Sequence, residues 1–259
     1  MGEAILSSLL VKGLSEPQDI FVSDVIESRR QYITEKYRVS VTGYNKDAVN
    51  GAEVVIMAIK PQNLTEVMED LHGQLKDDQL VLSIIAGATI RTLSSGLAHD
   101  RIVRVMPNTP AQIGEGMSVW TATHKVSKQQ KGWASSILGA IGKEIYVDDE
   151  KYLDMVTAVS GSGPAYFFLF IEALVEAAVG IGLSSDIAQE MVLQTMLGSG
   201  HLVQKSGKPP AELRRMVTSK GGTTEAALNV LGEGEFNNLI KKAVNAAYNK
   251  AKILGGSQK

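Results

Sequence analysis

The run Val54-Val55-Ile56-Met57-Ala58-Ile59 is apolar throughout and rich in β-branched side chains. An unbroken apolar run of this length is typical of a strand that is covered on both faces of a sheet. Leu80-Val81-Leu82-Ser83-Ile84-Ile85 nearly repeats the pattern, and the helical pattern of Leu64–Leu71 separates the two runs. Strands that alternate with helices predict a parallel sheet with helices on its faces.

The same alternation extends over the first half of the chain. Further strands are expected in five short runs, at Ile20–Asp24, Val39–Val41, Ile102–Val105, Met117–Trp120 and Ile145–Val147. Further helices are expected at Glu3–Lys12, Ile26–Lys36 and Lys128–Ile141. Residues 1–149 are therefore predicted to form an α/β domain.

After about Asp149 the pattern changes, and no convincing strand follows. Helical patterns occupy the rest of the chain, at Leu153–Val159, Ala165–Ile181, Asp186–Lys205, Pro210–Met216, Thr224–Leu231 and Phe236–Leu254. Residues 150–259, about 110 in all, have a usual domain size, and we expect them to form an all-helical domain. Its apolar helices are too extensive for such a domain to bury alone. We therefore expect at least a homodimer, with the Ala165–Ile181 helix buried against other helices near the interface.

Composition limits the functions that the chain can serve. Its 26 basic and 28 acidic side chains give a net charge of −2, so no basic field points to nucleic acid. There is no cysteine, which excludes thiol catalysis, and the four histidines show no ligand spacing, so no metal site is expected. Glu172 and Glu176 lie within the most apolar run, Ala165–Gly182, which argues against a membrane span. No secretory signal pattern opens the chain, so a cytoplasmic location is expected.

A glycine pair marks the stretch Val217-Thr218-Ser219-Lys220-Gly221-Gly222-Thr223-Thr224-Glu225-Ala226-Ala227-Leu228. Gly221 and Gly222 permit a tight turn and the close approach of a ligand. Thr223 and Thr224 stand where the N-cap of the following helix is expected. Free amide N–H groups at such a turn bind a carboxylate or a phosphate. Taken alone, the stretch is a common capping turn. The other motifs of the chain favour an anion-binding site here.

The start of the chain indicates a dinucleotide site. Gly2 opens a helix and fits the last glycine of a G-x-G-x-x-G turn, and Asp24 ends the next expected strand, 22 positions later. An acidic residue about 20 positions after such glycines bonds the adenosine ribose. The first strand and the first two glycines of the pattern are absent from the sequence. We therefore expect weak cofactor affinity from these 259 residues alone.

Three loops after expected strands carry small residues: Ala58-Ile59-Lys60-Pro61-Gln62, Ile85-Ala86-Gly87-Ala88 and Met106-Pro107-Asn108-Thr109-Pro110. Ligands of open α/β sheets bind at the carboxyl ends of the strands. Small residues and a lysine at that edge suit a flat ring and a pyrophosphate. Each loop alone could be an ordinary turn, but three in succession favour a nucleotide site.

Together these motifs resemble the pyrroline-5-carboxylate reductase family over essentially the whole chain. The most specific element is Leu213–Thr224, which contains the glycine turn, and the second is the elbow Ser160-Gly161-Ser162-Gly163-Pro164-Ala165-Tyr166. The loops Ala58–Pro61 and Met106–Pro110 are the third and fourth elements. The resemblance implies an α/β Rossmann-like dinucleotide-binding domain, its first strand absent from this sequence, followed by an all-α dimerisation domain.

The resemblance also implies an activity, the NAD(P)H-dependent reduction of 1-pyrroline-5-carboxylate to L-proline, which is the last step of proline biosynthesis. Thr224 is the candidate catalytic residue and would hydrogen-bond the ring nitrogen. Substrate binding is assigned to Ser219, Gly221, Gly222, Thr223 and Thr224, with Glu150 as a further position. Cofactor contacts are assigned to Met1, Gly2, Asp24, Asn45, Ala58, Ile59, Lys60, Pro61, Ile84, Ile85 and Ala86.

Two positions depart from the family pattern. Lys220 stands where the family commonly has proline, and it either strengthens carboxylate binding or is simply solvated. Asp24-Val25 stands where many members carry an asparagine–arginine pair that suits a 2′-phosphate. Because an aspartate repels that phosphate, we expect a tilt from NADPH toward NADH, with Arg29 and Arg30 as the candidates that would rescue NADPH use.

Two other functions stay open from the sequence. A β-hydroxyacid dehydrogenase-like oxidoreductase shares the layout, but it usually needs a catalytic lysine on a helix, and the helix after Ser160–Pro164 contains none. A truncated, non-catalytic dimerising or amino-acid-binding relative is favoured by the incomplete nucleotide pattern and disfavoured by the intact Ser219–Thr224 turn. A larger assembly of dimers also stays open.

Overall fold

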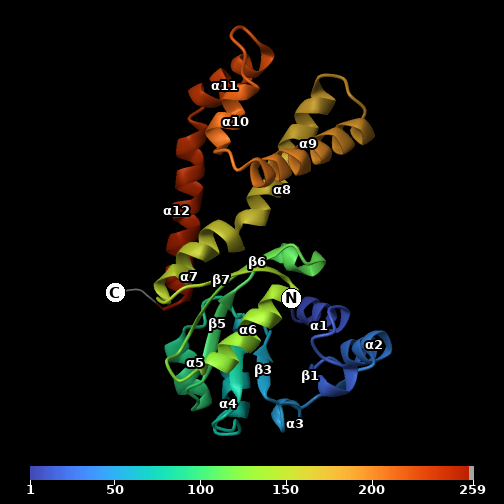
Figure 1. Ribbon diagram of the computed structural model, residues 1–259, viewed down its shortest axis with the longest axis vertical. Coiled ribbons are helices and arrows are strands. Elements are labelled where there is room, and N and C mark those ends of the chain that lie inside the picture. Colours follow the sequence, from blue (N-terminus) through green and yellow to red (C-terminus); the bar gives the residue numbers. More distant parts are fainter. Residues whose placement is uncertain (257–259) are drawn as a thin grey trace. The chain divides into compact units, whose positions relative to one another are not determined.

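The structure is a computed structural model that describes residues 1–256 of the chain (Figure 1). Its contacts divide the chain into two compact units. The first unit is Met1–Ser162 together with the described residues from Ala247 to Gly256, and the second unit is Gly163–Ala246. The division expected at residue 150 therefore lies within the first unit, to which the end of the final helix also belongs.

The first unit contains the strands of the described residues, and they form two sheets (Figure 1). A parallel pair consists of β1 (Phe21–Ser23) and β2 (Ser40–Thr42). The second sheet has the order β3-β4-β5-β6-β7, with β3 (Val54–Met57), β4 (Leu80–Ser83), β5 (Ile102–Met106), β6 (Gly116–Ala122) and β7 (Gly142–Tyr146). Every expected strand is present, with small shifts at the ends.

The expected parallel sheet has one antiparallel pair of neighbours, β5 and β6. Strands β3, β4 and β5 are parallel, but β6 runs antiparallel to β5, with Val105 opposite Trp120, and β7 is parallel to β6. Only a short 3-10 turn, Thr109–Ile113, connects β5 to β6. A parallel neighbour needs a crossover of a dozen or more residues, so this short connection permits only an antiparallel strand.

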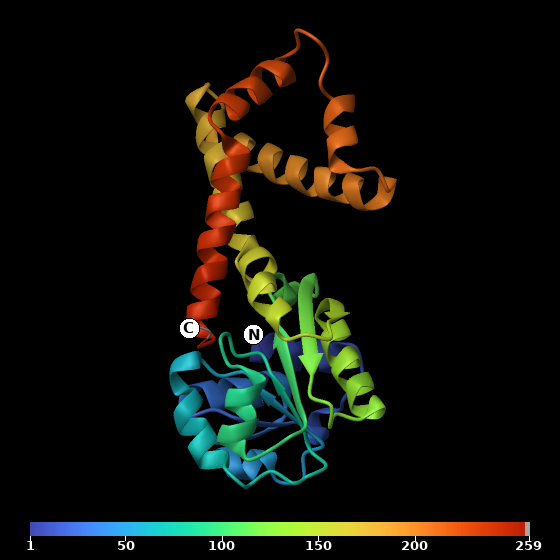
Figure 2. The same ribbon diagram turned by 90° about the vertical axis from the view of Figure 1, so that its left-hand side faces the viewer.

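Helices cover the five-stranded sheet on both faces. The α-helices of the first unit are α1 (Gly2–Val11), α2 (Glu27–Tyr37), α3 (Asn45–Val49), α4 (Leu64–Leu71), α5 (Ile90–Leu97), α6 (Lys128–Ala140) and α7 (Lys151–Val156). Figure 2 shows the sheet with α6 on one side and α4 and α5 on the other. The expected helices α1, α2, α4 and α6 are confirmed within one residue at each end.

Strand β4 is buried along its whole length, as its apolar run predicts. Leu80 and Leu82 belong to a core cluster with Ile5 of α1 and Leu138 of α6. Val81, which points to the opposite face, belongs to the cluster that contains core residues of α4 and α5. Strand β3 also contacts both clusters, but it is only half-buried over most of its length because it forms the edge of this sheet.

Helix α5 lies outside the sequence-based expectations, although a capping signal precedes it. The Thr89 side chain accepts a hydrogen bond from the backbone N–H of Thr92 at 3.1 Å, as an N-cap residue does. Leu93 and Leu97 are fully buried four residues apart, on one face of the helix. These two signals together predict the helix.

A long helical stretch leads from the first unit into the second. It comprises α7, the π-helical segment Thr157–Gly161 and α8 (Gly163–Gly180). The backbone N–H of Ser162 donates to the carbonyl of Thr157 at 2.8 Å, which closes the wider π turn. A Cβ on Gly161 would fall 2.6 Å from the Met106 side chain, so glycine permits this turn to pack on the end of β5.

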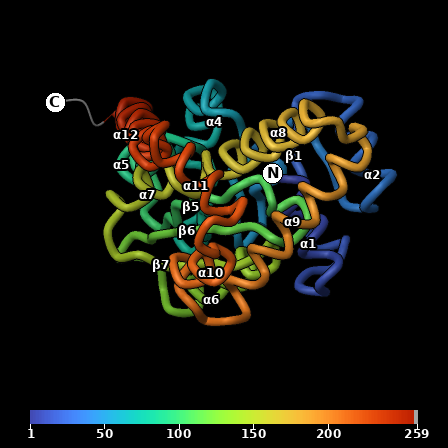
Figure 3. Tube along the Cα trace, turned by 90° about the horizontal axis from the view of Figure 1, so that it is seen from above, coloured from blue at the N-terminus to red at the C-terminus, as the bar shows by residue number. Residues whose placement is uncertain are grey.

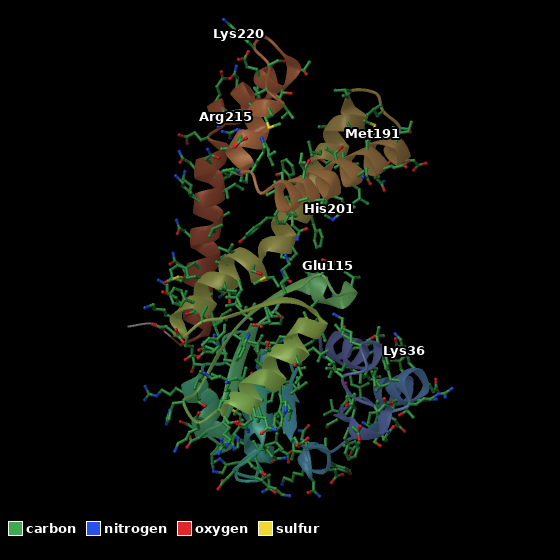
Figure 4. The ribbon with its side chains drawn as sticks, in the orientation of Figure 1. Lys36, Glu115, Met191, His201, Arg215 and Lys220 are labelled. Carbon is green, nitrogen blue, oxygen red and sulfur yellow. The ribbon has the colours of Figure 1, made fainter. Side chains whose placement is uncertain are left out.

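The second unit is helical and leaves its apolar side chains largely exposed. It contains α8, α9 (Ser185–Ser206), α10 (Pro210–Met216), α11 (Thr223–Glu233) and most of α12 (Phe236–Leu254). Helix α9 returns beside α8, and Met191 and His201 lie along it (Figures 3 and 4). Phe167, Phe168 and Leu169 of α8 are 57–65% exposed. The expected burial of this helix against other helices is therefore not found within the single chain.

One helix of residues 1–256, Lys151–Gly180, is long and apolar enough to cross a membrane. Length and composition are weak evidence, since the core helix of a soluble protein passes the same test.

Candidate active site

The N-terminus of α1 lies against the end of β3. A Cβ on Gly2 would fall 3.0 Å from the Cβ of Ala58, so a glycine permits the close approach of helix and strand. No side chain caps this helix at Met1, and its first N–H groups have no helical acceptor. A helix N-terminus at the carboxyl ends of parallel strands is suited to a pyrophosphate. The residues present therefore fit the expected dinucleotide.

The loops after β3 and β4 begin side by side. The backbone N–H of Ile84 donates to the carbonyl of Met57 at 3.1 Å, just beyond the last paired residues of the two strands. Met1 and Ile84 also pack against the same core cluster. The structure thus brings the candidate residues Met1, Gly2, Ala58 and Ile84 to one edge of the sheet, where Ile59–Pro61 and Ile85–Ala86 continue the two loops.

Asn108 anchors the third loop, which follows β5. Its side-chain oxygen accepts the backbone N–H of Met117 at 2.8 Å, and its side-chain nitrogen donates to the Ser160 hydroxyl at 3.3 Å. Two motifs that stand 52 positions apart in the sequence, the Met106–Pro110 loop and the Ser160 elbow, are therefore in contact. No sequence pattern singles out Asn108 for this role.

Asp24 and Asn45 lie beyond the ends of β1 and β2. The backbone N–H of Asp24 donates to the carbonyl of Thr42 at 3.1 Å, which extends the pairing of the two strands. Asn45 accepts a hydrogen bond from the Ser23 hydroxyl at 2.9 Å and donates to Asp70 at 3.1 Å. Both candidate residues are therefore held in place by hydrogen bonds. The side-chain amide of Asn45 makes two of them, to Ser23 and Asp70.

Glu3 gathers the polar side chains between α1 and α2. Its carboxylate pairs with Arg29 and with Lys36, the latter at 3.0 Å, and accepts hydrogen bonds from Tyr37 at 2.7 Å and Tyr32 at 3.0 Å. Burial alone would raise the pKa of Glu3, but the hydrogen bonds from Tyr37, Arg29, Lys36 and Tyr32 outweigh it and lower that pKa to about 2. The hydrogen bond to Glu3 in turn raises the pKa of Arg29. Glu3 therefore ties α2 to α1.

Glu150 is held inside the first unit by a buried arginine. Arg104 of β5, whose side chain is 6% exposed, donates to Glu150 Oε1 at 2.6 Å and lies 3.6 Å from Asp154. The same Glu150 oxygen accepts the backbone N–H of Ile90 at 2.7 Å, at the start of α5. These contacts favour a positioning role for Glu150, and its contact with substrate stays a prediction. In the sequence, Arg104 is marked only as the one charged residue in the apolar run Ile102–Val105.

The glycine turn of the second unit joins α10 to α11, and Figure 4 shows Lys220 at its tip. Gly221 has a φ of +74°, a left-handed conformation that favours glycine. A Cβ on Gly222 would fall 2.6 Å from the hydroxyl of Ser219, so a larger residue there would displace that hydroxyl. The N-cap is Gly222, and the expectation that the threonines cap the helix is therefore wrong: Thr223 begins it.

A carboxylate of the chain already binds one amide of this turn. The backbone N–H of Gly221 donates to Glu225 Oε2 at 2.7 Å. The first intrahelical bond of α11 runs from the N–H of Ala226 to the carbonyl of Gly222 at 3.2 Å. The N–H groups of Thr223 and Thr224 precede this bond and have no helical acceptor. The turn therefore presents amide donors to an anion, as its sequence predicts.

The fold and these two groups of residues define an oxidoreductase that uses a nicotinamide dinucleotide and carries a separate helical unit. Residues 1–87 match the family model "NADP oxidoreductase coenzyme F420-dependent", and residues 150–254 match "Pyrroline-5-carboxylate reductase dimerisation". A pyrroline-5-carboxylate reductase of Synechocystis sp. is 41% identical, over 98% of this chain and 95% of that protein. The chain belongs to the pyrroline-5-carboxylate reductase family, which confirms the resemblance.

Further relatives agree with this assignment. A pyrroline-5-carboxylate reductase of Pseudomonas aeruginosa is 40% identical, over 98% of this chain and 93% of that protein. Among solved structures, the pyrroline-5-carboxylate reductase of Coxiella burnetii has a TM-score of 0.89 at 38% identity and covers 98% of this chain and 94% of its own. The Plasmodium falciparum enzyme, solved with NADP bound, has a TM-score of 0.89 at 30% identity with the same coverage. The Rossmann-like fold with a dimerisation domain is thus confirmed.

Proposed function

We propose that the chain reduces 1-pyrroline-5-carboxylate to L-proline with NADH or NADPH, the last step of proline biosynthesis. Relatives that align with nearly the whole chain are named for this activity. The observation that carries the proposal is the Ser219–Thr224 turn, where helix amides, a glycine pair and hydroxyl groups stand together. A ring that bears one carboxylate and one nitrogen offers two polar groups that such a turn can hold.

In this proposal, the turn binds the substrate carboxylate through backbone amides. Ser219, Gly221, Gly222 and Thr223 surround the carboxylate, which replaces the Glu225 carboxylate at the N–H of Gly221. Fixed amide dipoles need no reorganisation during the reaction, so they stabilise a bound anion at little cost. The hydroxyl of Thr224 accepts the N–H of the ring nitrogen and orients the ring.

A bound nicotinamide supplies the hydride that adds to the imine carbon, while the ring nitrogen keeps the proton that makes the imine electrophilic. The work of the chain is to align two rings, and no histidine base is required. The proposed cofactor contacts are Met1, Gly2, Asp24, Asn45, Ala58, Ile59, Lys60, Pro61, Ile84, Ile85 and Ala86. Their placement at the N-terminus of α1 and beyond the carboxyl ends of β1, β2, β3 and β4 supports this assignment.

The role of Thr224 is tested by two variants at the same position. We expect Thr224→Val to lower kcat/KM for thioproline about 10- to 100-fold, because it leaves the ring N–H without its partner. Thr224→Ser keeps the hydroxyl and should stay within a few-fold of the native chain. Oxidation of the proline analogue thioproline with cofactor gives the rates. Equal rates for the Val and Ser variants would contradict the proposed role of Thr224.

The same assay separates the alternatives. A β-hydroxyacid dehydrogenase is not favoured by the relatives, and α8 contains no lysine that could serve that chemistry. A non-catalytic binder predicts no turnover by folded protein that still binds proline. Turnover of thioproline would exclude the binder.

We further propose a homodimer that buries the apolar helices of the second unit. Three neighbouring side chains of α8, Phe167, Phe168 and Leu169, are more than half exposed, and contiguous apolar surface of this kind marks interfaces. The family model for dimerisation matches this region. Light scattering should give twice the monomer mass of 27.8 kDa or an even multiple of it. A monomer across the measured concentrations would contradict the proposal.

A cytoplasmic location, without a membrane or nucleic-acid partner, completes the proposal. The apolar Lys151–Gly180 stretch is assigned to the dimer, and the net charge of −2 offers no field for nucleic acid. Recovery of the protein in the membrane fraction after cell lysis would contradict this location.

A further inference from the structure

Asp24 lies just beyond the carboxyl end of β1, and Arg29 and Arg30 lie in the first turn of α2, which follows it. Rossmann-like sites use this corner to hold the adenosine ribose, where an acidic residue bonds a free 2′-hydroxyl and an arginine accommodates a 2′-phosphate. The sequence places Asp24, Arg29 and Arg30 here and does not say which of them acts. The inference below rests on the proposed use of a nicotinamide dinucleotide.

Asp24 is held in a fixed orientation. Its backbone N–H donates to the carbonyl of Thr42 at 3.1 Å, and its Oδ1 accepts the N–H of Ile26 at 2.9 Å. Its other carboxylate oxygen has no hydrogen-bond partner within residues 1–256. The side chain is half-buried at the strand ends, so an acceptor with a full negative charge is available there to a ribose.

Arg29 feels the charge of Asp24 but makes its hydrogen bond to Glu3 instead. Its guanidinium pairs with Glu3 of α1 and lies over the ring of Tyr32, 4.8 Å from the ring centre. Glu3 is also held by Lys36, and the whole cluster belongs to the contact between α1 and α2. Moving Arg29 to a phosphate would break an ion pair that is partly buried, with side chains 39% and 26% exposed.

Arg30 lies at the corner itself. Its Nη1 donates to the backbone carbonyl of Asp24 at 2.7 Å. Its guanidinium also lies against Gly43, where a Cβ would fall 3.4 Å from Nη1. A guanidinium has five N–H donors, so this single hydrogen bond leaves donors for a further anion.

We propose that Asp24 selects a free ribose 2′-hydroxyl, and therefore NADH, and that Arg30 rather than Arg29 is the latent phosphate contact. The Asp24 carboxylate accepts the 2′-hydroxyl and repels a 2′-phosphate at the same place. Once the charge of Asp24 is removed, the guanidinium of Arg30 pairs with that phosphate. The Plasmodium falciparum relative binds NADP, and in this chain the acid at position 24 opposes that cofactor.

The test measures binding of the two adenosine ends by titration calorimetry with the full chain, using 5′-AMP and adenosine 2′,5′-bisphosphate as probes. The native chain should bind 5′-AMP at least 10-fold tighter than the bisphosphate. Asp24→Asn keeps an oxygen for the N–H of Ile26 and should reverse the order of the two probes. Adding Arg30→Gln should abolish the gain, whereas adding Arg29→Gln should leave it within two-fold.

Several outcomes would overturn the inference. They are tighter binding of the bisphosphate by the native chain, an unchanged ratio in Asp24→Asn, and loss of the gain through Arg29→Gln instead of Arg30→Gln. Binding of neither probe would also overturn it, since the ribose corner would then not be formed. The readout is independent of turnover, so failure of thioproline oxidation with an intact probe ratio would count against the proposed reaction alone.

Discussion

The first unit of the chain buries a core of its own, whereas the second unit leaves most of its large apolar side chains exposed. In the first unit, Leu80, Leu82, Leu93 and Leu138 are fully buried. In the second unit, which the structure describes completely, the buried residues are Gly163 and Ala188, and Leu169 is 65% exposed. The first unit therefore satisfies the usual condition for independent folding, and the second does not satisfy it within the single chain.

The two units also build their candidate sites differently. The proposed cofactor residues come from several strand ends that the sheet registers align, whereas the proposed substrate turn is one contiguous segment. A site of the first kind depends on distant contacts, and a site of the second kind depends on local backbone geometry. Substitutions that disturb one kind of site and leave the other unchanged test this difference between the two units.

The largest effect is expected at the exposed apolar face of the second unit. Leu169→Glu places a charge in the proposed dimer interface, and we expect association to weaken about 1000-fold, or about 4 kcal/mol. Val11→Glu in the first unit changes a side chain that is 83% exposed, and it should leave association unchanged. Analytical ultracentrifugation measures both. An equal effect of the two variants would remove the distinction between the units.

The next effect is expected at the buried arginine of the first unit. Arg104→Leu leaves Glu150 and Asp154 without their cation, and we expect a loss of about 3 kcal/mol in the free energy of unfolding. The matched control is Lys151→Met, which removes an exposed pair with Asp149 at 2.8 Å. Exposed pairs contribute about 0–1 kcal/mol. Urea denaturation compares the two, and similar losses would show that burial does not distinguish them.

A smaller effect is expected at the glycine turn. Gly221→Ala forces a Cβ into a left-handed conformation, φ +74°, at a cost of about 1–2 kcal/mol. Because this strain moves the amides of the turn, KM for pyrroline-5-carboxylate should rise about 10- to 30-fold, while the unfolding of the first unit should not change. Gly232→Ala in the same helix, α11, has open space around its Cβ and should leave KM unchanged. Steady-state kinetics decides, and an unchanged KM in Gly221→Ala would exclude the turn from the substrate site.

The smallest effect concerns the pH dependence of the first unit. The pKa of Glu3 is lowered from 4.5 to about 2, so Glu3 stabilises the folded state above pH 4.5, and this contribution is lost as the pH falls toward 2. Glu3→Gln should cost about 1 kcal/mol at pH 7, allowing for solvent screening, and less at pH 3. Glu35→Gln, at an exposed site, is the control. A cost of Glu3→Gln that does not change with pH would contradict the assignment.

Much of the fold follows from local pattern. The strands β3 and β4 and the helices α4, α10 and α12 are readable because apolar period and length mark them. The direction of β6 does not follow from apolar period, because it is set by the length of the connection from β5, which is too short for a parallel crossover. The N-cap of α11 was misplaced because Gly222, Thr223 and Thr224 all suit a helix start, and only the backbone dihedrals distinguish them.

In the candidate site, too, features made by neighbouring residues could be predicted and contacts between distant residues could not. The glycine turn was visible because its residues are consecutive, and a φ of +74° at Gly221 is what a glycine in a tight turn predicts. The role of Arg104 was not visible, because its partner Glu150 stands 46 positions away. The contact of Asn108 with Ser160 spans 52 positions and is equally hidden.

The sequence alone predicts an α/β half, a helical half and a glycine turn before a helix, because apolar period and backbone freedom act over a few neighbouring residues. The fold adds what arises between distant segments. It turns β6 against β5, directs Arg29 toward Glu3 while Arg30 stays beside Asp24, and leaves α8 exposed. Each of these features depends on contacts between residues that are far apart in the sequence. Strand register and helix packing determine those contacts, and both exist only in the folded chain.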